Sequence, residues 1–268
     1  MGEAARDIYR ETAGEAVSRL RLLSYNIQAG VDTRHFREYL TKSWKQVLPH
    51  RERLVNLNRI SHMLHRYDIV GLQEVDSGSL RSGFVDQTEY LAQLAGFPFW
   101  YKQVNRSLGK LAQHSNGVLS RIRPTAVVEH KLPGLPGRGA MLLEYATNTD
   151  AAFAVCIMHL ALGRRARGRQ LAYVSELVSQ YHYLVVMGDF NCGCDARELK
   201  GLVKSANLRA PECDMKTFPS WRPMRNLDHI LVSSSLRIGK AEVVDYPLSD
   251  HLPVSMEVDL PEGLSIIT

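Results

Sequence analysis

The stretch YLVVMGDFNCGC, residues 183–194, joins a fully apolar run to an acid and an amide two residues apart. The apolar run predicts a buried strand over residues 183–190. Because side chains alternate along a strand, Asp189 and Asn191 are expected to point to the same side at its end. Cys192 and Cys194 follow at once, but no CxxC pair exists, so zinc is disfavoured and the cysteines are expected to pack in a turn.

Composition places the chain among soluble proteins. Its 268 residues and 45% hydrophobic content allow one large domain or two small ones. No apolar run is long enough to span a bilayer and no signal-peptide core is present, so a cytoplasmic location and a monomer are expected. Four irregularly spaced cysteines do not form a disulfide framework. The net charge of +5 is compatible with a polyanionic partner but does not demonstrate one.

Residues 19–268 are expected to form a single domain of many strands and a few helices, preceded by a polar helix or tail over residues 1–18. Two packed sheets covered outside by helices would bury the apolar runs on both faces. Strands are predicted at 21–27, 68–75, 99–104, 117–120, 125–130, 140–145, 152–159, 183–190, 227–233, 238–245 and 254–258. Helices are predicted at 51–67, 88–95, 164–180 and 196–206.

Polar side chains recur where these apolar strands end. An ionised group that is buried without a partner is costly, so each such residue needs an explanation, and a capping or turn role is the ordinary one. Convergence of several would build a pocket of carboxylates, carboxamides and imidazoles. Such oxygen ligands suit Mg²⁺ or Mn²⁺ bound next to phosphate oxygens. The residues are Asn26, Glu74, His159, Asp189, Asn191, Asp228, Asp250 and His251.

The motifs SYNIQ (24–28), LQEVD (72–76), MGDFN (187–191), NLDHIL (226–231) and SDHLPV (249–254) stand in a fixed order. Together they resemble the endonuclease/exonuclease/phosphatase superfamily, the deoxyribonuclease-I-like fold, over about residues 21–258. The resemblance implies an α/β fold, a four-layer α/β sandwich of two mainly antiparallel or mixed sheets flanked by helices. It also implies a metal-dependent phosphoester hydrolase with its site at one end of the sheets.

The resemblance implies the roles of the metal ligands. Glu74 resembles the main Mg²⁺ ligand, Asn26 lies beside it in the motif pattern, and Asp250 is similar to an acid at or near the metal.

The same resemblance implies the catalytic residues. Asp189 and Asn191 look like the pair that orients water and holds a phosphate oxygen. His251 resembles the general acid/base, Asp228 the carboxylate that orients it, and His159 the histidine that contacts the scissile phosphate. Whether Asp189 or His251 removes the proton of water stays open.

Other residues are expected to face the substrate. Asn116, in a stretch that also resembles the family, is a candidate phosphate contact, with an ordinary Asn-Gly turn as the alternative. His114 is expected in a loop. Arg164 begins the basic run RRARGR and Arg138 lies in the loop GLPGRG, so both are candidates to bind non-scissile phosphates. A solvated helix start and an ordinary surface loop are the alternatives.

The predicted function is therefore a Mg²⁺-dependent phosphoester hydrolase, with Mn²⁺ as a possible substitute. A phosphodiesterase acting on nucleic acid is favoured, because of the basic balance and the arginines near the site. The alternative is a phosphodiesterase of lipid or inositol-type substrates, which would require an exposed apolar patch near the pocket. A pseudoenzyme is disfavoured because all motif residues are present.

Overall fold

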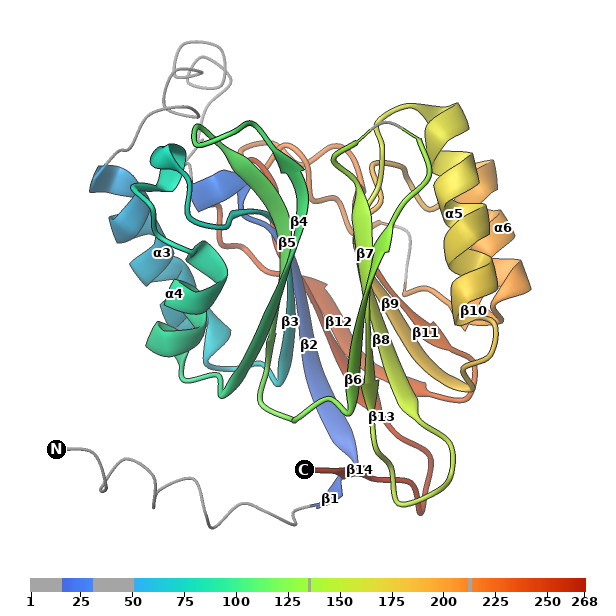
Figure 1. Ribbon diagram of the computed structural model, residues 1–268. Helices are drawn as coiled ribbons and strands as arrows, with labels where there is room; N and C mark the ends of the chain where they lie inside the picture. The colour runs from blue at the N-terminus through green and yellow to red at the C-terminus, as the bar shows by residue number, and fades with distance from the viewer. Residues whose placement is uncertain (1–15, 31–50, 135, 212–213) are drawn as a thin grey trace, which may run out of the picture.

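In a computed structural model, residues 16–30, 51–134, 136–211 and 214–268 are described. Two six-stranded sheets pack face to face (Figure 1). The first sheet has the order β12 (Arg237–Val243), β13 (Val254–Asp259), β2 (Arg19–Asn26), β3 (Ile69–Asp76), β5 (Gln113–Ser120) and β4 (Phe99–Ser107). The second has β10 (Leu208–Arg209), β11 (Asp228–Ser233), β9 (Tyr183–Asp189), β8 (Phe153–His159), β7 (Gly139–Tyr145) and β6 (Ala126–Lys131).

Helices cover the outer face of each sheet, which gives the predicted four layers (Figure 1). The helices α3 (Arg51–Leu64) and α4 (Gln87–Ala95) pack on the first sheet, and α5 (Arg164–Val178) and α6 (Arg197–Ser205) pack on the second. None of the helices in the described ranges is both long and apolar enough to cross a bilayer.

The apolar core falls into three clusters that correspond to the three interfaces between layers. The cluster between the sheets joins Leu22 and Ile69 to Ile157 and Val185. Strands buried on both faces are continuously apolar, which is why these runs predict strands without polar alternation. Gly71 allows close packing between the sheets, because a Cβ there would lie 3.1 Å from a methyl carbon of Ile157.

Strand direction brings the functional residues to one edge. β2 and β3 are parallel, as are β8 and β9, so Asn26, Glu74, His159 and Asp189 lie at or near carboxyl ends. β5, β7, β11 and β13 run antiparallel to these strands. The connections before those four antiparallel strands therefore lie at the same edge, called here the site edge.

The structure adds elements that the sequence pattern did not predict. Ala16 and Val17 form β1 (Ala16–Val17), which pairs with β14 (Ile266–Ile267). Short 3₁₀ turns η1 (Gln28–Gly30) and η3 (Leu80–Ser82) follow β2 and β3. The remainder of the N-terminal segment expected as a polar helix or tail, residues 1–15, lies outside the described residues.

Two local expectations were wrong. β5 begins at Gln113 rather than 117, so His114 lies on a strand and not in a loop. Its pairing with β4 extends past a register shift, which apolar periodicity does not reveal. The cysteines also differ from the expectation, because Cys192 is free and buried but Cys194 is disulfide-bonded. Only Cys192 fits the predicted packing role.

Candidate active site

Asp189 lies at the centre of the site edge and is almost fully buried. Gly188 allows the approach of β8, because a Cβ there would lie 1.9 Å from the carbonyl oxygen of Met158. Asn26 donates a hydrogen bond from Nδ2 to Asp189 Oδ2 at 3.1 Å, and His159 Nε2 lies 3.3 Å from the same oxygen. Burial alone raises the pKa of Asp189, but the nearby His251 and His159 hold it well below its usual range. Asp189 is therefore ionised.

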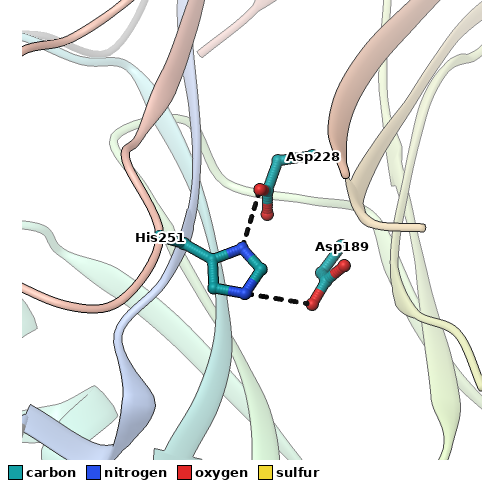
Figure 2. A group of neighbouring side chains, drawn as sticks. All are labelled: Asp189, Asp228 and His251. Carbon is teal, nitrogen blue, oxygen red and sulfur yellow. Dashed lines mark hydrogen bonds and ion pairs between the residues drawn. The ribbon is translucent and has the colours of Figure 1, made fainter. Parts of the chain in front are cut away.

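His251 and Asp228 form a buried pair (Figure 2). His251 Nδ1 lies 2.8 Å from Asp228 Oδ2, and the Thr217 hydroxyl donates to that oxygen at 2.5 Å. His251 Nε2 lies 4.0 Å from Asp189 Oδ2. Burial lowers the pKa of His251, but the charges of Asp228 and Asp189 raise it to about 10. The ring is held in one orientation as a protonated imidazolium.

Glu74 and Asp250 add negative charge that the neighbouring His251 imidazolium offsets only in part, because the pKa of Asp250 stays raised. Glu74 lies at a register shift of β3 with a φ of 56°, and this bulge turns its half-buried side chain towards the site. Burial and the charge of Glu74 raise the pKa of Asp250 to about 6.

This excess of negative charge fits a divalent cation, which would stabilise both ionised carboxylates. Asn26 adds a carboxamide nearby, and its Oδ1 accepts a hydrogen bond from the Gln28 N–H at 3.1 Å. The donor set of Glu74, Asp250 and Asn26 consists of oxygens, which suits a hard cation such as Mg²⁺. One potential metal-ligand atom from each of Asp189, Asp228 and His251 also lies within 4.8 Å of the other two. The Nδ1 atom of His251, however, is already hydrogen-bonded to Asp228.

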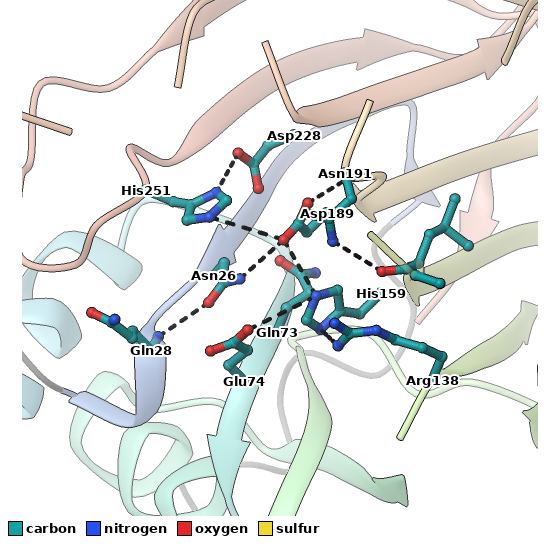
Figure 3. Close-up of polar contacts among 12 residues, drawn as sticks. Asn26, Gln28, Gln73, Glu74, Arg138, His159, Asp189, Asn191, Asp228 and His251 are labelled. Atoms are coloured by element: carbon teal, nitrogen blue, oxygen red, sulfur yellow. Dashed lines mark hydrogen bonds and ion pairs between the residues drawn. The ribbon is translucent and has the colours of Figure 1, made fainter. Parts of the chain in front are cut away.

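Arg138 fixes the tautomer of His159 (Figure 3). Arg138 Nη1 lies 3.0 Å from His159 Nδ1, and a guanidinium has only donors. Nδ1 must therefore accept, so Nε2 carries the hydrogen. Nε2 points towards Asp189 and lies 3.9 Å from Glu74 Oε1. His159 is thus a neutral hydrogen-bond donor at the site.

Hydrogen bonds position Asn191 at the site, and not the strand alternation that was predicted. The strand ends at Asp189 and Asn191 has a φ of 54°, so the alternation of a strand does not place its side chain. Instead, the Asn191 N–H donates to Asp189 Oδ1 at 2.9 Å, and its Nδ2 donates to the carbonyl of Leu160 at 2.9 Å. Asn191 therefore orients Asp189 and ties it to the loop after β8.

The other residues expected to face the substrate lie further out. Asn116 is fully buried and donates to the carbonyl of Gly139 at 3.0 Å, so it bridges the two sheets. It lies on β5, which corrects the alternative of an ordinary turn. Arg164 is the first residue of α5, with a side chain 73% exposed and 3.8 Å from Glu198.

A pocket of about 450 Å³ opens beside Glu74 and His159. Arg106 and His114 line it together with Arg138, and neither was predicted as a site residue. The remaining lining is mainly small or apolar: Asn105, Ser115, Pro136, Gly137, Ala161, Leu162, Gly163 and Ala166. Only the pairing of β4 with β5 brings Arg106 and His114 opposite one another, so no local sequence signal identifies them.

Gln73 was also missed, although it lies within a quoted motif. Its side chain is fully buried, its Oε1 accepts from the Ser24 hydroxyl at 3.4 Å, and its Nε2 has no partner among the described residues. Figure 3 shows this amide between Asn26 and His159. A buried donor of this kind would bind a ligand oxygen or water at the site.

Comparison with known proteins identifies the family. The model of the endonuclease/exonuclease/phosphatase family matches residues 23–251. A search of curated proteins gave no match. The chain belongs to the endonuclease/exonuclease/phosphatase family, whose members are metal-dependent phosphoester hydrolases, and it is an enzyme of that class.

Solved structures support the fold. An endonuclease/exonuclease/phosphatase family protein from Bacteroides thetaiotaomicron is 18% identical with a TM-score of 0.67, over 90% of this chain and 98% of that one. The mannosyl-6-phosphatase of the same organism is 16% identical with a TM-score of 0.65, over 89% and 99%. The catalytic domain of human Nocturnin with bound sulfate is 18% identical with a TM-score of 0.62, over 91% and 95%.

Proposed function

We propose that the chain is a Mg²⁺-dependent phosphodiesterase that cleaves its substrate by attack of water on phosphorus. The observation that carries this proposal is the convergence of Glu74, Asp250, Asp189 and the His251–Asp228 pair at the site edge beside a pocket with two arginines. When bound by Glu74, Asp250 and Asn26, the metal ion supplies charge that neutralises phosphoryl oxygens.

The chain's own residues handle the proton and the charge. Asp189 is ionised, which supports its role in orienting water and accepting its proton. A bond forms between the water oxygen and phosphorus while the ester P–O bond breaks; the proton of the water passes to Asp189, and the leaving oxygen takes its proton from the His251 imidazolium. The imidazolium of His251, oriented by Asp228, and the Nε2–H of His159 are donors for the charge that develops.

The pocket accommodates a phosphate together with an organic group attached to it. Arg106 and Arg138 suit a phosphate, whereas Pro136, Ala161 and Leu162 offer apolar contacts to a group beyond it. A monoester substrate such as that named for the mannosyl-6-phosphatase is the competing possibility.

Nucleic acid, the substrate class first expected, retains the support of the basic residues at the site edge. The lipid alternative is supported by large apolar side chains exposed in the loops of the site edge, among which Leu162 lines the pocket itself. We therefore favour a phosphodiester in a lipid headgroup over nucleic acid. A cytoplasmic location and a monomeric state stay predictions.

The test is a turnover assay with Mg²⁺, with Mn²⁺ and with EDTA. Substrates are bis-p-nitrophenyl phosphate, p-nitrophenyl phosphate, single-stranded DNA, RNA and glycerophospholipid vesicles. Metal-dependent cleavage of the diester in preference to the monoester is expected. Unchanged turnover in EDTA, or cleavage of the monoester alone, would refute the proposal. Glu129→Gln, an exposed position on β6 outside the pocket lining, serves as a control that retains activity.

A further inference from the structure

Exposed apolar side chains gather in the loops of the site edge. Exposed fractions are 64% for Phe84, 45% for Leu108, 53% for Leu111, 75% for Leu162 and 60% for Met224. These five residues are called here the apolar rim. Solvent exposure of large aliphatic side chains is unfavourable, and a group of them around a pocket is typical of a binding surface.

Several loops carry the rim, and two of them are connected by backbone hydrogen bonds. The turn between β4 and β5 pairs with the 3₁₀ turn after β3, because Leu80 N–H donates to Lys110 O at 2.8 Å and Arg81 N–H donates to Leu111 O at 3.1 Å. The two turns therefore form one rigid unit next to the pocket that Arg106 and Leu162 line. Figure 1 shows the β4–β5 turn at the end of the sheet opposite the termini.

Phe84 is held in an unfavourable conformation. Its φ of 64° lies in the left-handed region, which is rare for a bulky residue. The residue is nevertheless kept there with its ring largely in solvent, and the Phe84 N–H donates to Ser79 O at 2.8 Å. Backbone strain at a residue whose side chain stays largely exposed is typical of a surface that acts on a partner.

Positive charge surrounds the apolar rim. Exposed cations of the described loops, strand ends and helix starts at the site edge include Arg106, Lys110, Lys131, Arg164, Arg165, Arg197, Lys216, Arg222 and Arg225, against the exposed acids Asp195, Asp214 and Asp245. Cations beside exposed aliphatic side chains complement a surface with anionic headgroups above hydrocarbon.

We propose that the site edge docks on an anionic phospholipid bilayer, with the apolar rim inserted among the lipids and the pocket mouth facing the headgroups. The proposal rests on the proposed function in that a lipid phosphodiester would then enter the pocket from the bilayer. Nucleic acid fits this surface less well, because four of the five rim side chains are leucine or methionine and only Phe84 has the flat face on which a base stacks. Burial of aliphatic groups in lipid is instead directly favourable.

The test separates docking from hydrolysis. Binding is measured by cosedimentation with phosphatidylcholine vesicles that contain 0 or about 30% phosphatidylglycerol, using Glu74→Gln protein so that the lipid stays intact. The rim variant Phe84→Ser/Leu108→Ser/Leu111→Ser/Met224→Ser is compared with the control Leu94→Ser/Val128→Ser. The control removes apolar side chains that are also exposed but lie away from the site edge.

We expect binding to anionic vesicles that weakens at least tenfold in the rim variant and is unchanged in the control. The charge variant Lys110→Glu/Arg222→Glu should also weaken binding to vesicles that contain anionic lipid. Added salt should weaken this binding as well, because it screens the charges. On the wild-type Glu74 background, the rim variant should hydrolyse bis-p-nitrophenyl phosphate normally, which also shows that it is folded. Equal vesicle binding by the rim variant and the parent would overturn the proposal.

If the Glu74→Gln protein binds single-stranded DNA but does not bind the vesicles, the membrane proposal is overturned in favour of nucleic acid. A failure of the proposed function has a different signature, since loss of metal-dependent diester cleavage leaves vesicle binding unaffected.

Discussion

Replacement of Asp76 by alanine should destabilise the loop that follows β3 and, with it, the bulge that aims Glu74. Asp76 is fully buried and its carboxylate accepts hydrogen bonds from the backbone N–H groups of Gly78 at 3.0 Å and Ser79 at 2.7 Å. The Ser79 and Ser82 hydroxyls add bonds of 2.7 and 2.9 Å. Arg81 Nε donates at 2.8 Å, which completes a buried ion pair.

The magnitude follows from what the substitution leaves behind. The Arg81 side chain is only 6% exposed, so removal of its partner leaves a buried guanidinium without a carboxylate. Breaking a buried pair in this way costs about 3–5 kcal/mol. For a domain of this size each kcal/mol lowers Tm by about 2–4 °C, so a fall of about 6–20 °C is expected.

Urea denaturation and thermal unfolding at pH 7 measure the effect. Asp76→Asn keeps an oxygen acceptor and should cost less than Asp76→Ala. In Asp76→Ala/Arg81→Met the unpaired cation is absent, so the double variant should be more stable than the sum of the two single changes predicts. A loss below about 1 kcal/mol for Asp76→Ala, or strict additivity, would contradict the argument.

The pH dependence of the free energy of unfolding tests the same interactions of Asp76. Burial raises the pKa of Asp76, but the Ser79 bonds and the charge of Arg81 outweigh it and hold that pKa below its usual value. Because the folded-state pKa is lowered, the contribution to stability is complete above the unfolded value of about 3.9 and is lost as the pH falls towards the folded value. Asp76→Asn should therefore flatten the acid limb of the stability curve below about pH 4.

Further predictions concern the active site. Glu74→Ala should abolish turnover and lower Mg²⁺ affinity by isothermal titration calorimetry without changing Tm in EDTA; undiminished Mg²⁺ binding would remove Glu74 from the ligand set. In metal-free protein, Asp228→Asn should lower the pKa of His251 from about 10 by NMR titration, because the largest raising charge is lost; an unmoved resonance would contradict the pairing. Arg138→Met should free Nδ1 of His159 to take the hydrogen and reduce kcat about tenfold or more, with Arg138→Lys partly restoring it. An unaffected kcat in Arg138→Met would show that this tautomer is not required.

The fold was predictable because its signals are local. Runs such as residues 183–187 are apolar without alternation, which is expected of strands buried on both faces. The polar residues at the ends of these runs predicted a site at one edge of the sheets. The order of their motifs along the chain resembled that of the endonuclease/exonuclease/phosphatase superfamily. Asn26, Glu74, Asp189 and His251 do converge there, as predicted.

Other features could not be predicted because they depend on contacts between distant segments. Arg138 reaches His159 only because β7 and β8 pair with Gly139 opposite His159. The direction of Glu74 depends on a bulge against β5, which sequence periodicity does not encode. Strand alternation does not connect Asn191 to Asp189, because the strand ends at Asp189 and the connection is made by the backbone N–H of Asn191.

The residue sequence by itself determined the layered α/β fold, the chemistry of oxygen ligands and paired histidine, and the membership of a phosphoester-hydrolase family. These follow from local composition, since burial of an apolar strand and the donor type of a side chain are properties of short segments. Tertiary structure decided the protonation of His251, the tautomer of His159, the lining of the pocket and the exposure of the apolar rim. Electric fields, tautomers and solvent exposure depend on which distant groups are brought together, and only the folded chain specifies that.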